Sequence, residues 1–309
     1  MPPKKKPPRK HAHLYSWARI DRAGAMHDAR VHLGAAYELL EADADFGLHM
    51  LQQEYTLRAD LRPSMTSFVA LQIFHRAIDL LDGLSVLVKA GSVTPMTPLV
   101  RSFLEAMMYA RYLMTVNDER VAAAYVVSQP LALMAGIEAE ADKHAGGSTP
   151  TIAKRRARRD LEVLLGEERL FREARTELAR LSKASSVLAP WYQAFDGPRT
   201  LGGMSKRLND EDLERLFERA YDPWSQAAHV GDTTRSLAPE VEDVKNAAEL
   251  LVPLRSASRK TIVEMVRVCH EMFLMLVRHQ VEYFREPPVG YDQYTRVEGQ
   301  LVVSLGEAT

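Results

Sequence analysis

The sequence predicts an all-α protein: an irregular multi-helix bundle from which a charged helical hairpin projects. Apolar residues recur three and four positions apart over most of the 309 residues, which is the period of a helix with one buried face. Capping residues, prolines and glycines interrupt this pattern where helices are expected to begin and end. Hydrophobic residues make up 46% of the chain and charged residues 26%, which is enough apolar material for a sizeable core.

Two long helices are expected in the first part of the chain. The apolar stripe runs through residues 21–60 and again through 63–90. Pro63 suits a first helical turn because its missing N–H has no partner to lose there. Gly91 is a natural residue to end the second helix, because glycine readily adopts the left-handed conformation of a helix terminus.

The next two helices are bounded by capping signals. Thr94-Pro95 or Thr97-Pro98 begins a helix that runs to about Val116, and Asn117 with Asp118 can cap the helix after it. Pro130 should kink or break this second helix, because proline removes a backbone hydrogen bond and clashes with the preceding turn.

A strongly charged segment follows the turn at residues 146–150. Five of the six residues 154–159 are basic, acidic residues are interleaved after them, and only a narrow apolar stripe continues. We expect a helical hairpin over residues 151–186, hinged near Gly166 and packed on one side only. The basic run can bind phosphates, but the interleaved acids dilute its field, which favours a solvated helix face.

The domain organisation follows from these elements. We expect a basic, disordered tail over residues 1–20, a single helical domain over 21–286 that contains the hairpin insertion 151–186, and a C-terminal tail over 287–309. The last long helix of the domain is expected at 256–285. Within the tail, residues 300–303 favour a strand, which would need a partner.

Composition narrows the classes of function. The charges nearly balance, with 40 Lys and Arg against 41 Asp and Glu, so bulk charge points to neither nucleic acid nor membrane. The single cysteine, Cys269, excludes an internal disulfide framework and a cysteine-rich zinc site. Its apolar surroundings predict a buried, inert thiol. We expect a cytoplasmic protein that does not enter a membrane.

Common catalytic motifs are missing. The sequence has no Walker-type phosphate loop, no dinucleotide-binding glycine pattern, no serine-hydrolase elbow and no His-Glu-x-x-His. We therefore expect neither a cofactor nor a metal.

Arg101 and Glu105 form the first candidate site. They are four residues apart, so a helix places them on one face, and their neighbours are apolar. A guanidinium and a carboxylate in such surroundings must be paired or hydrogen-bonded. Arg101 would bind a phosphate or another anion, with Glu105 orienting it. The competing explanation is an ion pair that only fixes packing.

The second candidate site is the segment from Tyr221 to Asp232. Ser225 and His229 are four residues apart on one helical face. Histidine titrates near neutral pH, so His229 can act as a general acid or base. Helical spacing alone does not set the geometry of a nucleophile and its base. A histidine that is simply satisfied by Ser225 is therefore the competing explanation.

These two motifs carry a resemblance to a family. The Leu99–Ala106 segment with Tyr112-Leu113, followed much later by Tyr221, Ser225 and His229, is similar to the pattern of an uncharacterised bacterial all-helical family of unknown function. The family shows an Arg-Ser/Thr-x-x-Glu helix and a downstream Tyr-x-x-x-Ser-x-x-x-His element, and the resemblance covers roughly residues 65–235. It implies a fold similar to HEPN and abortive-infection proteins. It also implies that the five polar residues share one pocket.

The resemblance suggests a bacterial defence or toxin-like effector whose pocket binds or cleaves RNA or a nucleotide. In a HEPN-like ribonuclease, His229, Ser225 and Glu105 would be catalytic, and Arg101 and Tyr221 would bind substrate. No Arg-x4–6-His pattern falls in the matched region, which counts against ribonuclease activity. The alternatives are a non-enzymatic adaptor, sensor or complex subunit that binds a protein partner through 151–186, and a regulator that binds a small ligand. A homo-oligomer is expected in each case.

Overall fold

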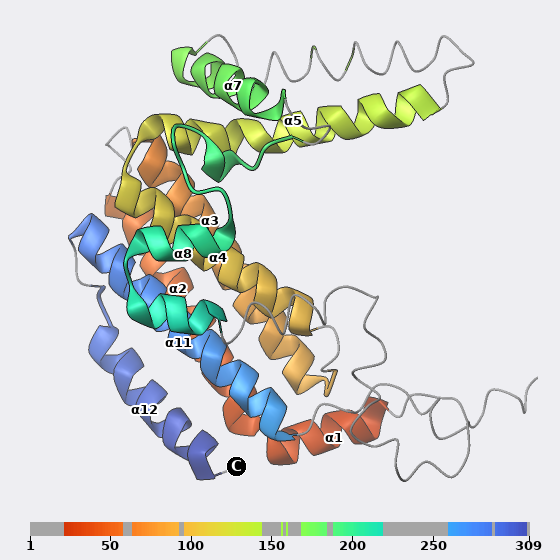
Figure 1. Cartoon of the computed structure of the whole chain (residues 1–309). Coiled ribbons are helices and arrows are strands. Elements are labelled where there is room, and N and C mark those ends of the chain that lie inside the picture. Colours follow the sequence, from red (N-terminus) through yellow and green to blue (C-terminus); the bar gives the residue numbers. More distant parts are fainter. Residues whose placement is uncertain are drawn as a thin grey trace, which may run out of the picture.

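The fold is an all-α multi-helix assembly, as predicted (Figure 1). The computed structural model describes residues 22–57, 64–92, 96–143, 156, 159, 168–183, 188–218, 259–285 and 288–307. Its elements, in chain order, are α1 Arg22–His32, α2 Gly34–Leu57, α3 Met65–Lys89, α4 Met96–Val116, α5 Glu119–Lys143, α7 Arg169–Ser182, the 3-10 helix η1 Trp191–Gln193, α8 Leu201–Leu208, a helix over 211–218, α11 Arg259–Phe284 and α12 Tyr291–Glu307.

Four long helices form the body of the molecule. α3 packs against both α2 and α4, and α11 closes the bundle by contacting α2 and α4. Their shared interior holds the largest fully buried side chains, among them Phe74, Phe103, Tyr112 and Phe273. α12 lies along the outside of α2, and α8 lies across α4 (Figure 1). None of the described helices combines the length and apolar character that crossing a bilayer demands.

The helix ends follow local chemistry. The hydroxyl of Ser64 accepts a hydrogen bond from the backbone N–H of Ser67 at 3.1 Å and so caps α3. At the other end, Gly91 adopts a φ of 65°, and the backbone bonds of Gly91 and Ser92 to Val88 and Leu87 complete a typical helix stop. Gly91 therefore ends α3 as predicted.

Three sequence-based expectations differ from the structure. The stripe over 21–60 is divided at Leu33 into α1 and α2. Pro130 lies inside α5 and does not break it. The strand expected at residues 300–303 is wrong, because these residues belong to α12. Burial of Tyr294 and Leu305 on one side of α12 stabilises a helix, and this packing overrides the local β-propensity.

Of the predicted charged hairpin, the structure describes the second arm, α7. This helix packs on α5, which runs across one end of the bundle (Figure 1). Only Ala174 and Leu178 of α7 are buried, so the helix is packed on one side. Apart from residues 156 and 159, the first arm lies outside the described residues, as does the N-terminal tail.

Candidate functional site

Arg101 and Glu105 form an ion pair on α4. The Nε of Arg101 donates to Oε1 of Glu105 at 3.1 Å, and the two side chains are 25% and 27% exposed. The pair is therefore half-buried, with each group offsetting part of the other's loss of hydration. This geometry fits both an anion-binding arginine held by its carboxylate and a pair that only fixes packing.

The other three predicted site residues, Tyr221, Ser225 and His229, lie outside the described residues. The structure therefore does not test whether they meet Arg101 in one pocket. That convergence stays a prediction.

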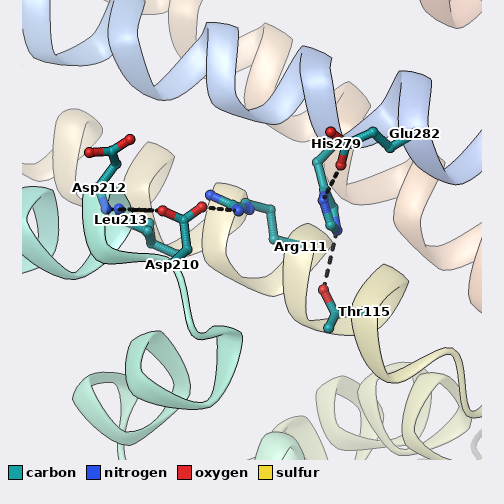
Figure 2. Close-up of polar contacts among 7 residues, drawn as sticks. All are labelled: Arg111, Thr115, Asp210, Asp212, Leu213, His279 and Glu282. Atoms are coloured by element: carbon teal, nitrogen blue, oxygen red, sulfur yellow. Dashed lines mark hydrogen bonds and ion pairs between the residues drawn. The ribbon is translucent and has the colours of Figure 1, made fainter.

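A second arginine of α4, Arg111, is the more deeply buried one. It lies ten residues beyond Arg101, about 15 Å along a helix, and only 8% of it is exposed. One of its nitrogens, Nη2, donates to Oδ2 of Asp210 (Figure 2). The other two, Nε and Nη1, are buried and have no hydrogen-bond partner. A guanidinium offers five donors, so most of the capacity of Arg111 is unused.

Asp210 links this arginine to the next helix. Its Oδ1 accepts hydrogen bonds from the backbone N–H groups of Asp212 and Leu213, each at 3.0 Å. Asp210 therefore caps the helix over 211–218 while it binds Arg111. Burial alone would raise the pKa of Asp210, but the hydrogen bonds from Leu213 and Arg111 outweigh it and hold this pKa below its ordinary value. The carboxylate is thus ionised at neutral pH.

His279 of α11 lies on the other side of Arg111 (Figure 2). Its Nε2 is 3.2 Å from the hydroxyl of Thr115, and its Nδ1 is 3.6 Å from a carboxylate oxygen of Glu282. Burial lowers the pKa of His279, and the positive charge of Arg111 lowers it further. The imidazole is therefore neutral at neutral pH, and it adds no positive charge to the site.

A cleft of about 540 Å³ opens between the helix 211–218 and α11. This size is within the range of small-molecule sites. The helix that Asp210 caps forms one wall and α11, which carries His279, forms the other, but Arg111, Asp210 and His279 themselves do not line the cleft. Its lining mixes two arginines and two carboxylates with apolar side chains: Asp212, Arg215, Leu216, Glu271, Leu274, Met275 and Arg278.

The feature of this arrangement that needs a chemical explanation is the pair of buried nitrogens of Arg111 without a hydrogen-bond partner. Arginine binds phosphate or carboxylate through two parallel N–H donors, and Arg111 has donors to offer. Among the described residues, no group of three His, Cys, Asp or Glu side chains is placed to hold a metal ion.

Comparison with protein families finds a family model that matches the chain. Residues 67–240 match the model of a family of unknown function, DUF5677, and this is more than half of the 309 residues. The chain belongs to the DUF5677 family. Neither the curated proteins nor the solved structures give a match.

The DUF5677 segment contains both polar sites of α4. Arg101, Glu105, Arg111 and Asp210 fall within it, as do the undescribed residues Tyr221–His229. α11 and α12 lie beyond it. The part of the site that DUF5677 defines is therefore α4 with the capped helix at 211–218, and α11 supplies the facing wall.

Sequence reasoning missed Arg111, Asp210 and His279. Arg111 has no acidic residue three or four positions away on its helix, and its partner Asp210 is 99 residues distant. One signal was present: a lone arginine inside the apolar run from Tyr109 to Leu113. A charge in such a run must find a partner elsewhere in the fold.

Proposed function

We propose that this DUF5677 protein binds RNA or a nucleotide through a phosphate held by Arg111, and that it acts as a helical effector of the bacterial defence or toxin type. The observation that carries the binding proposal is the pair of buried, unpaired nitrogens of Arg111. Leaving a buried donor without a partner costs about 1–3 kcal/mol, more when the group is charged. A bound phosphate would recover that cost.

The surroundings support a ligand rather than a purely structural arginine. In the cleft, Arg215 is paired with Asp212 at 2.6 Å, and Arg278 supplies a second guanidinium. Arg278 is exposed and makes no ion pair among the described residues. Leu216, Leu274 and Met275 add apolar surface that suits a nucleobase. The competing explanation is ordered water, which often satisfies buried polar groups.

The binding test is a thermal-shift titration with ATP, GTP, inorganic phosphate and a short single-stranded RNA. A ligand that binds the folded state raises Tm with concentration. We expect at least one of the phosphate compounds to raise Tm, and Arg278→Gln to weaken that binding by about tenfold, which corresponds to roughly 1.4 kcal/mol. Arg111→Lys, which keeps the charge but loses the fork, should abolish the shift.

The controls separate binding from folding. Arg278 is exposed, so Arg278→Gln should leave the Tm of the free protein unchanged. Arg120→Lys at the start of α5 is the matched control, since it alters an exposed arginine paired with Asp118 and not the Arg111 cluster. If no phosphate compound shifts the wild-type Tm, the binding proposal is wrong. A non-enzymatic adaptor acting through 151–186 then becomes the better candidate.

RNA cleavage is a separate proposal, which the wild-type protein and the same RNA can test. In the ribonuclease version, His229 transfers the proton, Ser225 and Glu105 assist, and Arg101 and Tyr221 hold the substrate. We expect RNA that binds the wild type to be cleaved, and His229→Ala to bind RNA without cleaving it. Cleavage that persists in His229→Ala with an unchanged Tm contradicts the catalytic role and leaves the binding proposal intact.

A further inference from the structure

A second buried polar cluster lies away from the Arg111 cleft, between α2, α11 and α12. Asp43 of α2 is fully buried. Its carboxylate accepts a hydrogen bond from the hydroxyl of Tyr294 at 2.6 Å and lies 3.0 Å from Nδ1 of His270. The other ring nitrogen of His270, Nε2, is 3.1 Å from Oε1 of Glu298. A single imidazole thus joins carboxylates from two helices.

This geometry specifies the protonation of His270. Each ring nitrogen faces a carboxylate oxygen, and a carboxylate can only accept. Both contacts are hydrogen bonds only when the imidazole carries two protons. With one proton, one nitrogen lone pair would face a carboxylate. The contact to α12 or the contact to α2 would then become repulsive.

The remaining attachment of α12 is mainly apolar, with one further hydrogen bond from Nη2 of Arg267 to the carbonyl of Leu305 at 3.5 Å. Tyr294 stacks on Phe46 of α2 with ring centroids 4.2 Å apart, and Leu305 is buried near the end of the helix. Two residues near the connection between α11 and α12 have positive φ, Arg285 at 60° and Gly290 at 80°. α12 therefore follows a turn and is held by the contacts of Glu298 and Tyr294, by Arg267 and by an apolar seam.

We propose that His270 is a proton-controlled latch, which holds α12 on α2 and α11 while the imidazole is doubly protonated and releases it when the imidazole is neutral. Asp43 is the fixed half of the latch, because it is buried in the body of the molecule. Glu298 is the detachable half, because it is carried by α12. Tyr294 donates to Asp43 while α12 is closed and leaves with α12 when it opens.

The direction of the pH response follows from the charges around His270. Burial alone would lower the pKa of His270, but the hydrogen bonds and negative charges of Asp43 and Glu298 outweigh it and raise this pKa above its ordinary value of 6.5. Burial also raises the pKa of Asp43, so the pair keeps its proton to a higher pH. Below pH 6.5, the contribution of His270 to the stability of closed α12 is fully present. It is lost as pH rises through the raised pKa.

Other titratable groups nearby do not replace His270 in this role. Tyr291 of α12 faces Tyr294, with ring centroids 6.4 Å apart. The thiol of Cys269 is fully buried, and burial raises its pKa. His49 of α2 is exposed and lies beside Gly290, so it needs a control of its own.

Hydrogen exchange measures the latch directly. The opening constant of α12 amides, corrected for the pH dependence of intrinsic exchange, should rise up to about tenfold per pH unit between pH 6.5 and the raised pKa and then level off. Amides of α3 should show no such rise. In His270→Gln the α12 amides should open more readily at neutral pH, and the rise with pH should be absent.

Three variants keep the result interpretable. Glu298→Gln leaves the buried Asp43–His270 pair intact, so it should fold even if His270→Gln fails to fold. It should also reduce the pH response of α12 opening. His279→Gln on the same helix and His49→Gln near the connection should retain the full response. A wild-type α12 whose opening is independent of pH overturns the latch. A response that survives Glu298→Gln undiminished, or that disappears with His49→Gln, overturns it equally.

Discussion

At the scale of single residues, two glycines inside helices differ in the space available for a side chain. A Cβ at Gly47 of α2 would lie 2.9 Å from Cγ1 of Ile78 and 3.1 Å from a ring carbon of Phe273, whereas a Cβ at Gly136 of α5 would meet nothing within 4 Å. Gly47 therefore allows α2 to approach α3 and α11 closely, while none of the described residues packs against Gly136.

We expect Gly47→Ala to destabilise the protein by about 1–3 kcal/mol, because overpacking forces neighbouring side chains to move. Gly136→Ala should instead stabilise it by about 0.5–1 kcal/mol, because alanine loses less conformational entropy in a helix. Urea denaturation of both variants checks this, with the slope m unchanged. A stabilised Gly47→Ala would mean that α2 has room to shift outward.

The candidate site shows what residue-level sequence reasoning can reach. The pairing of Arg101 with Glu105 is local, so a four-residue spacing was enough to predict it. Arg111 binds Asp210, and His270 binds Asp43 at 3.0 Å across 227 residues. No periodicity connects such partners, because they are brought together by packing of helices. The burial of Cys269, by contrast, follows from its apolar neighbours, and the structure confirms it.

At the scale of elements, the N-terminus of α3 is held by a small set of polar groups. The hydroxyl of Ser64 accepts from the backbone N–H of Ser67 and so caps α3. Oε1 of Glu119, at the start of α5, accepts from the backbone N–H of Met65 at 3.2 Å. These acceptors satisfy two of the backbone donors that a helix start leaves unpaired. The capping of α3 thereby also joins it to α5.

We expect Ser64→Ala to lower the free energy of unfolding by about 1 kcal/mol, with Ser64→Asp restoring most of the loss because aspartate caps equally well. Chemical denaturation of the three proteins decides it. Ser102→Ala is the matched control, since the hydroxyl of Ser102 only returns to the carbonyl of Pro98 within α4. Equal losses at Ser64 and Ser102 would show that the cap contributes nothing specific.

Elements whose identity depends on local signals were predictable, and those decided by tertiary contacts were not. Capping and glycine signals gave α3 and α4 nearly correct ends. Residues 300–303 carry β-branched side chains, yet they are helical because α12 packs on α2. Pro130 remains within α5, although proline usually interrupts a helix. In both cases the sequence states a preference that the packing of the whole helix outweighs.

At the scale of the whole molecule, the α5–α7 arm and the four-helix body are joined by aromatic rings. Trp191 of η1 is 6% exposed. Its ring lies edge-on to Tyr109 of α4 at 5.2 Å and to Tyr125 of α5 at 5.1 Å. α7 itself buries little, and its ion pairs, such as Arg169 with Glu173, are exposed and contribute little to stability.

This distribution predicts a hierarchy of stability that native-state hydrogen exchange can measure. Amides of α7 should open with a free energy well below that of α3 and α4, because local opening of α7 exposes few apolar side chains. Trp191→Ala should cost about 3–5 kcal/mol and should accelerate exchange in α7 and η1 far more than in α11, because it removes the rings' common partner. Leu178→Ala is a useful comparison, since it should loosen α7 without affecting the contacts of Trp191. If α7 instead exchanges only in the global unfolding transition, the arm and the body form one cooperative unit, and the aromatic junction does not divide them.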